Sequence, residues 1–413
     1  MPPPNPDLAD TPEPPAGTGC RTSPGWSHPP VVRRLSTVRT VRWWVWSVGA
    51  PLGLFEVTRL VQLVMLSLLS GDRPADLVGW LLIWDANWFV RIAEDGYEPG
   101  YSYDPTGELT GNGLAFFPLY PILIRGLAWL PGISPTGAAL AISWFAAGAA
   151  AVLLSLLGTR LYSRRTGYAL AVLFGAQPMS VILSMGYTEA LFCALVAAAL
   201  LAVHREAWLL AGGLAGLAAL TRPTGVALAG ALLAASLWSL WRDPGLNPSW
   251  RMPVGVLTSL LAAPLYLLWV GVRAGDLDAW FRIQRVGWGT RWDFGTSTWR
   301  FLVEVFSRGE GWVQLSTAVI VVAGVVLTVA AVSERVWLPL SLYGVFAFAM
   351  AVGSSGYYHS RPRMLVPVLL LLFPLAIVLG RCRPRTAVLV LTGATLLGCW
   401  YGAYLVTVWP YTI

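Results

Sequence analysis

The stretch Trp84-Asp85-Ala86-Asn87-Trp88-Phe89 follows the first long apolar segment of the chain, residues 46–70. It sets a carboxylate among aromatic side chains where a membrane span should give way to water. A purely interfacial turn would have a similar composition, because Trp and Tyr gather at both membrane surfaces. Other motifs in the chain are needed to distinguish a functional role of Asp85 from a place in an interfacial turn.

The composition is that of an integral membrane protein. The 413 residues are 56% hydrophobic and 12% charged, with a mean hydropathy of +0.62, whereas soluble domains carry about 25% charged residues. The net charge of +7 rests on arginine alone, since the chain has no lysine. Arginines spread along the chain argue against nucleic acid binding. Four scattered cysteines and three histidines argue against a disulfide framework or a zinc site.

Apolar runs predict an all-α bundle of about eleven membrane-spanning helices, of which the fourth and fifth are shorter than the length of about 20 residues that a span needs. The runs cover residues 46–70, 136–158, 166–183, 188–203, 207–221, 224–241, 253–273, 312–332, 336–353, 364–380 and 386–408. Residues 115–130 form a shorter run that contains Pro118, Pro121 and Arg125. We predict an interfacial helix there.

Charge placement predicts the topology. Residues 1–38 hold ten prolines in their first thirty positions and predict a disordered cytoplasmic tail before a membrane-embedded domain over residues 39–413. With the tail inside, the cytoplasmic side has 15 Arg against 6 acidic residues, and the other side has 12 against 14. This follows the positive-inside rule. We therefore expect a multi-pass protein of the cell membrane with external segments 71–135 and 274–311.

Two local features follow from helical spacing. Residues 85–94 predict a short helix along the membrane surface, with Trp88, Phe89 and Ile92 on one face. Glu56 and Arg59 lie three residues apart within the first span, where an unpaired charge costs several kcal/mol. We expect these two side chains to pair with each other.

Most of the unusual polar residues fall on the predicted external side. The cluster comprises Asp85, Arg91, Tyr97, Tyr187, Glu189, Arg222, Tyr357, Tyr358, His359, Arg361 and Arg363. Such a set offers carboxylates for a hydroxyl group and arginines for a phosphate, which the planar guanidinium binds through two hydrogen bonds. The alternative for Arg361 and Arg363 is a role as headgroup anchors. Asp276-Leu277-Asp278 spells a D-x-D pattern, which is too short to predict a metal site.

Several of these motifs resemble those of PIG-V-type mannosyltransferases. The first external loop carries the most specific ones, in Trp84 to Phe89, Ile92-Ala93, Gly96-Tyr97 and Ala115-Phe116-Phe117-Pro118-Leu119-Tyr120-Pro121. Tyr187-Thr188-Glu189 resembles a tyrosine–Ser/Thr–Glu turn of that family. Gly275-Asp276, Phe281, Gln284 and Trp288-Gly289 match a later loop, and Arg361-Pro362-Arg363-Met364 matches an Arg-rich turn. Thr221-Arg222-Pro223-Thr224-Gly225 departs from the family's Arg-Ser-Asn-Gly at Pro223 and Thr224.

The resemblance implies a GT-C fold, a multi-span helical bundle with an extracytoplasmic active site. It implies transfer of mannose from polyprenyl-phosphate mannose to a lipid-linked or cell-envelope glycan, without a metal or other cofactor. Asp85 would be the catalytic base. The donor phosphate would be bound by Arg222, His359, Arg361 and Arg363. The acceptor or the sugar would be bound by Trp84, Asn87, Trp88, Arg91, Tyr97, Tyr187, Glu189 and Gln284.

Two other classes of function stay open at this stage. A transporter or flippase of a lipid-linked glycan would place charges near the membrane midplane and often has repeated half-domains. In this sequence only Glu56 and Arg59 lie deep, and no two-fold repeat is evident. A non-catalytic subunit of GT-C shape is the other alternative.

Overall fold

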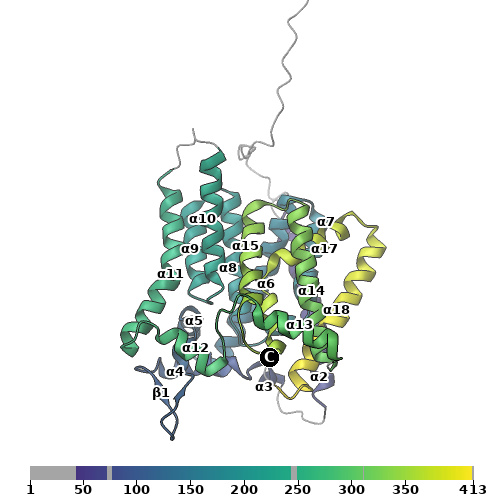
Figure 1. Ribbon diagram of the computed structural model, residues 1–413. Helices are drawn as coiled ribbons and strands as arrows, with labels where there is room; N and C mark the ends of the chain where they lie inside the picture. Colours follow the sequence, from purple (N-terminus) through teal and green to yellow (C-terminus); the bar gives the residue numbers. More distant parts are fainter. Residues whose placement is uncertain (1–42, 72–76, 243–248, 310, 412–413) are drawn as a thin grey trace, which may run out of the picture. The chain divides into compact units, whose positions relative to one another are not determined.

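The computed structural model describes residues 43–71, 77–242, 249–309 and 311–411. This part is almost entirely helical, and its long helices run side by side (Figure 1). The elements are η1 (Val45–Gly49), α2 (Ala50–Leu69), α3 (Leu77–Leu81), α4 (Asp85–Asp95), β1 (Ser102–Tyr103), β2 (Leu109–Thr110), η2 (Gly113–Ala115), α5 (Leu119–Ala128), α6 (Pro135–Leu161), α7 (Arg164–Ala176), η3 (Ser180–Leu183), α8 (Glu189–His204), α9 (Trp208–Ala219), α10 (Gly225–Arg242), α11 (Arg251–Ala274), α12 (Ala279–Trp288), α13 (Thr296–Arg308), α14 (Trp312–Ser333), α15 (Leu338–Gly353), η4 (Tyr358–Ser360), α16 (Arg361–Leu365), η5 (Leu369–Leu371), α17 (Leu372–Arg381) and α18 (Pro384–Thr407). The predicted tail, residues 1–38, lies outside the described residues.

The predicted apolar runs form helices, but not all of them are long. Six described helices are long and apolar enough to cross a membrane, and a seventh span arises if Tyr358–Leu365 and Leu369–Arg381, bent by 74°, count as one. The elements α8, α9 and α15 are shorter apolar helices of 16, 12 and 16 residues. The multi-pass membrane class is therefore confirmed, whereas the count of eleven spans stays a prediction.

Small residues allow the central helices to approach closely. The element α9 packs against α11 at Gly212, where an added Cβ atom would lie 2.1 Å from the carbonyl oxygen of Gly255. Any larger side chain would push these backbones apart. Close approach through small residues is the usual way in which helices associate in membranes.

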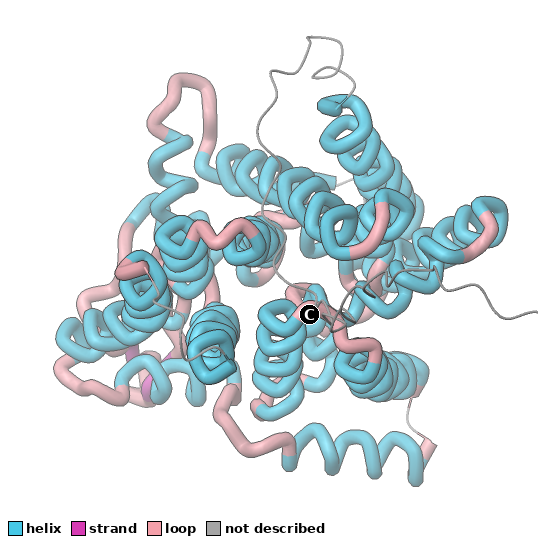
Figure 2. Tube along the Cα trace, turned by 90° about the horizontal axis from the view of Figure 1, so that it is seen from above, coloured by secondary structure: helices cyan, strands magenta, loops and turns pink. Residues whose placement is uncertain are grey.

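The two long segments predicted to be external meet at one end of the bundle. The elements α4, α5 and the β1–β2 hairpin lie there together with α12, as Figure 1 shows. The two short strands are drawn in magenta in Figure 2, where helices and loops make up the rest of the described chain. The predicted helix over residues 85–94 is confirmed as α4, with Phe89 and Ile92 buried and Trp88 half-buried. The 115–130 run contains α5. Both helices form as predicted, and their position at the membrane surface stays a prediction.

Two arginines fasten this end of the structure to itself. Arg125 of α5 donates to the carbonyl oxygens of Ala93 (2.6 Å) and Glu94 (3.0 Å) in the last turn of α4. Arg273 of α11 donates to the carbonyl oxygens of Tyr97 and Glu98 just beyond it. Carbonyl groups at a helix end lack partners within the helix, so the two guanidinium groups hold α4 and its exit against the bundle.

The expected pairing of Glu56 with Arg59 is wrong. Arg59 donates instead to the carbonyl oxygens of Gly175 and Ser180, while Glu56 is exposed. The physical reason is the end of α7 at residue 176, which frees carbonyl groups inside the bundle. A buried guanidinium satisfies several such acceptors at once, whereas pairing with Glu56 would leave them unsatisfied.

Replacing Arg59 by Gln should lower the free energy of unfolding by about 1–3 kcal/mol, because buried carbonyl groups lose their donor. Thermal unfolding of the detergent-solubilised protein measures this loss. Glu56→Gln is the matched control and should unfold like the unmodified protein. Equal losses of stability in the two variants would indicate that Glu56 and Arg59 pair with each other after all.

Candidate active site

Asp85 begins the helix α4 at the end of the bundle where the two segments predicted to be external meet. The preceding residue, Trp84, has a positive φ of 56°, which is unusual for a bulky side chain. This conformation turns the chain sharply into α4, so that Asp85 occupies the first helical turn. A carboxylate is stabilised there by the helix dipole. Its side chain is 21% exposed, which leaves it accessible to a small group.

Asp85 is the outer end of a chain of ion pairs. Its Oδ2 atom lies 2.5 Å from Nη2 of Arg363. Nε of Arg363 lies 2.6 Å from Oε1 of Glu189, and Nη1 of Arg222 lies 2.6 Å from the same oxygen. Two carboxylates and two guanidinium groups thus alternate in one connected network with no formal net charge.

Four separate parts of the chain supply these groups. Glu189 opens α8, and Arg222 lies in the turn between α9 and α10. Arg363 belongs to α16, a five-residue helix before the 74° bend that leads into α17. Because the bend interrupts an otherwise apolar segment, it brings a charged side chain to Glu189 and Asp85.

Glu189 is the most constrained member of the network. Its side chain is fully buried, with 0% exposure, and its second oxygen, Oε2, has no hydrogen-bond partner among the described residues. A carboxylate so far from water is tolerated only when opposite charges and hydrogen bonds compensate for the lost solvation. Arg222 and Arg363 provide that compensation, and Glu189 in turn fixes where both guanidinium groups lie.

The turn Tyr187-Thr188 contacts both arginines of the network. The ring of Tyr187 lies 4.4 Å from the guanidinium carbon of Arg363, and its hydroxyl donates to the carbonyl oxygen of Ile83, next to Trp84. Ser143 of α6 donates to the backbone carbonyl of Tyr187 (3.0 Å). Arg222 also donates to the hydroxyl of Thr188 (3.0 Å). The turn therefore connects both ends of the ion-pair chain.

Sequence reasoning missed Ser143 and Thr188 as supports of this turn. The only signal for Ser143 is a hydroxyl in the alanine-rich segment that forms α6. Thr188 lies within the recognised turn motif, but nothing in the motif indicates which side chain it contacts. Both roles depend on a neighbour more than 30 residues away along the chain.

An aromatic cluster lies one turn further along α4. Trp88 stacks on Phe116, with ring centroids 5.7 Å apart, and meets Trp288 of α12 edge-on at 6.0 Å. The guanidinium of Arg91 lies over the ring of Trp88 at 5.8 Å. Asn87 is exposed on the same helix. Aromatic faces and polar groups beside a carboxylate form a surface suited to a sugar.

Two predicted sugar-binding residues are engaged by backbone instead. Tyr97 donates to the carbonyl oxygen of Phe116 (2.9 Å), and Gln284 donates to that of Ala115 (3.1 Å). They hold the Ala115–Phe116 loop on which Trp88 packs. Burial, the largest contribution, raises the pKa of Tyr97, so this hydroxyl stays a donor.

The remaining arginine and histidine of the predicted phosphate site face other groups. Arg361 donates to the carbonyl oxygens of Ala351 (3.2 Å) and Ser354 (3.3 Å). His359 is buried, and neither ring nitrogen has a hydrogen-bond partner among the described residues. The structure thus brings Arg222 and Arg363 into one network and leaves Arg361 and His359 outside the ion pairs seen there.

The D-x-D carboxylate Asp276 has a structural environment. It accepts hydrogen bonds from the hydroxyl of Tyr101 (2.6 Å) and from Arg282 (2.9 Å). The Tyr101 contact is the main reason that the pKa of Asp276 lies below its usual value. The described residues contain no group of three His, Cys, Asp or Glu side chains arranged to hold a metal ion.

Comparisons with known proteins bear on the family and on the fold. Residues 67–243 match the model of the family described as Mannosyltransferase (PIG-V). GPI alpha-1,6-mannosyltransferase 2 of Rattus norvegicus is 33% identical over 167 residues, which are 38% of this chain and 32% of the relative. The Mus musculus protein of the same name is 31% identical over 207 residues, 48% of this chain and 40% of the relative. The chain thus matches less than half the length of these curated relatives.

A solved structure supports the fold independently. The apo crystal structure of the Archaeoglobus fulgidus oligosaccharyltransferase superposes with a TM-score of 0.51 at 12% identity, covering 88% of this chain and 56% of that one. The protein therefore shares the fold of that membrane protein. Its residues 67–243 match the PIG-V mannosyltransferase family model, and the predicted family resemblance is confirmed. Asp85, Glu189 and Arg222 lie within the matched residues, whereas Arg363 lies beyond them.

Replacing Glu189 by Gln should destabilise the fold strongly, by about 3–5 kcal/mol, because it leaves two buried guanidinium groups without their shared carboxylate. Asp85→Asn should cost much less, because Asp85 is partly exposed and Arg363 keeps Glu189. Thermal unfolding in detergent compares the two variants, with exposed Glu94→Gln as the control. A loss for Asp85→Asn as large as that for Glu189→Gln would contradict the central position of Glu189.

Proposed function

We propose that this protein is a membrane mannosyltransferase that takes mannose from polyprenyl-phosphate mannose and transfers it to a lipid-linked or cell-envelope glycan. The observation that carries the proposal is the contact between a partly exposed Asp85 and the guanidinium of Arg363, at one end of a GT-C-type bundle. A carboxylate and phosphate-binding cations are the two groups that this reaction needs side by side. The PIG-V domain supports mannose as the sugar.

In the proposed reaction, an acceptor hydroxyl attacks the anomeric carbon of the donor. Its O–H proton passes to the Asp85 carboxylate while the bond between the anomeric carbon and the phosphate oxygen breaks. The electron pair of that bond leaves with polyprenyl phosphate. A phosphate is a good leaving group, so one base is sufficient and no general acid is required.

Arg363 is the residue that connects the two halves of this reaction. Its Nη2 atom binds Oδ2 of Asp85, so one oxygen of the carboxylate is engaged by the guanidinium. A donor phosphate would compete for the same guanidinium through charge-assisted hydrogen bonds. We propose that donor binding draws Arg363 from Asp85 and frees the carboxylate to accept a proton. Arg222, held by Glu189, would supply the second positive charge.

The acceptor glycan would lie along α4. Asn87 and Arg91 are exposed there, and Trp88 offers part of an aromatic face. Trp84 would border the same surface. We assign Tyr187 and Glu189 to positioning the arginines, because both side chains are fully buried, and Tyr97 and Gln284 to holding the loop beneath Trp88.

The proposed site faces the extracytoplasmic side of the membrane, with the N-terminal tail in the cytoplasm. This orientation rests on the excess of arginine over acidic side chains in the loops that would face the cytoplasm. It agrees with a donor whose polyprenyl chain stays in the bilayer while its phosphate lies at the surface. The proposal includes neither a metal ion nor an organic cofactor.

Asp85→Asn should reduce mannosyl transfer by about 10²–10⁴-fold, the contribution expected of a positioned general base. The measurement is transfer from radiolabelled polyprenyl-phosphate mannose in membranes that contain the native acceptor, normalised to the amount of protein. Asp95→Asn, at the other end of α4, is the matched control and should retain activity. Retained activity in Asp85→Asn would move the base to another residue. Loss of lipid-glycan movement without any transfer reaction would favour a transporter.

Arg363→Lys should raise the KM for the donor and lower kcat. An ammonium group is a single point charge, whereas Arg363 contacts Glu189 and Asp85 through two different nitrogens. Initial rates over a range of donor concentrations measure both constants. Arg285→Lys is the control, because Arg285 is exposed on α12 and is not part of the ion-pair network. An unchanged donor KM in Arg363→Lys would show that Arg363 does not bind the donor phosphate.

A further inference from the structure

The helix α13 presents three different faces. Thr298 and Val305 are buried against the bundle. Trp299, Val303 and Phe306 follow one another at spacings of four and three residues and are 68%, 48% and 57% exposed. At 3.6 residues per turn these three side chains form one continuous apolar strip. The strip is unpartnered in the described part of the chain.

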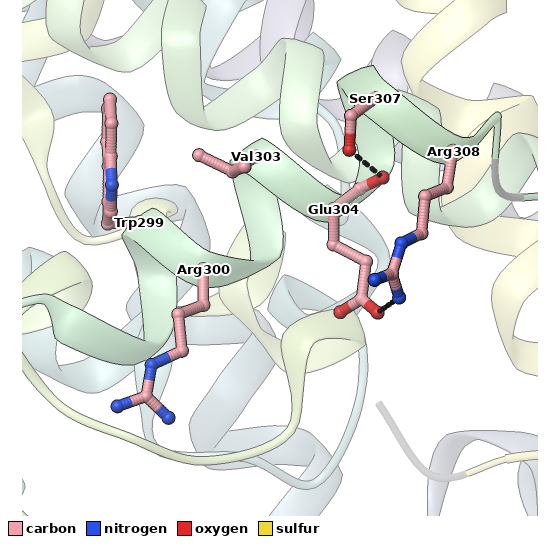
Figure 3. A pocket seen from close by; sticks show the side chains of 6 residues that line it. All are labelled: Trp299, Arg300, Val303, Glu304, Ser307 and Arg308. Atoms are coloured by element: carbon pink, nitrogen blue, oxygen red, sulfur yellow. Dashed lines mark hydrogen bonds and ion pairs between the residues drawn. The ribbon is translucent and has the colours of Figure 1, made fainter.

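A polar strip runs beside the apolar one. It consists of Arg300, Glu304, Ser307 and Arg308, which are all exposed. Glu304 and Arg308 pair at 2.9 Å, one turn apart. Figure 3 shows this pair pointing away from the Trp299 ring, with Arg300 extended on its own. Both strips border an open hollow of about 310 Å³.

The connection to α14 limits where the C-terminal end of α13 can lie. The helix ends at Arg308, and α14, the most apolar of the candidate spans with a mean hydropathy of 2.6, begins at Trp312. The four residue steps from Arg308 to Trp312 span at most about 14 Å. The C-terminal end of α13 must therefore lie close to the level at which α14 would enter the bilayer.

We infer that the apolar strip of α13 is inserted among the phospholipids around the start of α14, with the polar strip facing water. A helix with a narrow apolar face, a charged face and an aromatic anchor is suited to the membrane interface. Arg300 and Arg308 lie where they would meet lipid phosphates. The occupant of the strip is the phospholipid layer itself.

The position of α13 affects Arg361, because backbone hydrogen bonds connect the start of α13 to the segment that precedes Arg361. Just before the helix, the backbone amides of Asp293 and Gly295 donate to the carbonyl oxygen of Gly353. The amide of Ser355 donates to the carbonyl oxygen of Arg291 (2.7 Å). Arg361 is held by the carbonyl oxygen of Ser354 in the same strand-like segment. A lipid-anchored α13 therefore steadies the segment that positions Arg361.

Spin labels test directly which side chains of α13 face lipid and which face water. We would place single labels at Val303→Cys, Phe306→Cys, Glu304→Cys and Ser307→Cys in a Cys20→Ser, Cys382→Ser background, in vesicles of phosphatidylcholine and phosphatidylglycerol. The ratio of oxygen to water-soluble nickel accessibility should be several-fold higher at positions 303 and 306 than at 304 and 307.

Three outcomes would overturn the inference. Equal ratios at all four positions would place the whole helix in water. Labels at 303 and 306 that neither reagent reaches would indicate a protein partner or a second copy of the chain. A ratio that rises only after polyprenyl phosphate is added would assign the strip to the donor's chain.

Hydrogen–deuterium exchange tests the connection to Arg361. In the double variant Trp299→Ser, Phe306→Ser, the amides of Asp293, Gly295 and Ser355 should exchange several-fold faster in the same vesicles. Trp129→Ser, which removes an exposed tryptophan next to α5, is the control and should leave them unchanged. Unchanged exchange in the double variant would show that the lipid seat does not steady this segment.

Discussion

The carboxylate of Glu189 is buried between two guanidinium groups, and the end of the bundle that carries Asp85 depends on that arrangement. An ion with no access to water has a large desolvation cost, which only opposite charges and hydrogen bonds can offset. Glu189 therefore requires both Arg222 and Arg363, and these in turn draw the α9–α10 turn and α16 toward α8. Asp85 joins the network at its outer end, where some solvent remains.

The same arrangement explains how a charged site can exist in so apolar a protein. With two carboxylates and two arginines the network is formally neutral, so no net charge is buried. This balance of charge also matters for the proposed reaction. A phosphate that approaches Arg363 adds negative charge to the network. Of the two ion pairs of Arg363, the one with Asp85 is the more exposed, so we expect that one to break.

Arginine has a second task throughout the structure. Arg59, Arg125, Arg273 and Arg361 each donate to two backbone carbonyl oxygens. Short, broken and bent helices leave such carbonyls unsatisfied, and the five donors of a guanidinium can satisfy several at once. In this chain without lysine, arginine therefore has two roles. It forms ion pairs, and it donates hydrogen bonds to carbonyl groups at the ends of interrupted helices, which stabilises the irregular backbone near the site.

The sequence by itself determined the membrane class, the succession of apolar helices, the short helix at Asp85 and the family resemblance, because these follow from local composition, periodicity and motif. Only the tertiary structure decided the partners. Arg363 reaches Asp85 across 278 residues and Glu189 across 174, and no local pattern encodes that choice. The failed Glu56–Arg59 pair gives the physical reason. A spacing rule compares neighbours on one helix, whereas Arg59 responds to carbonyl groups left free where another helix ends, and only packing brings those groups within reach.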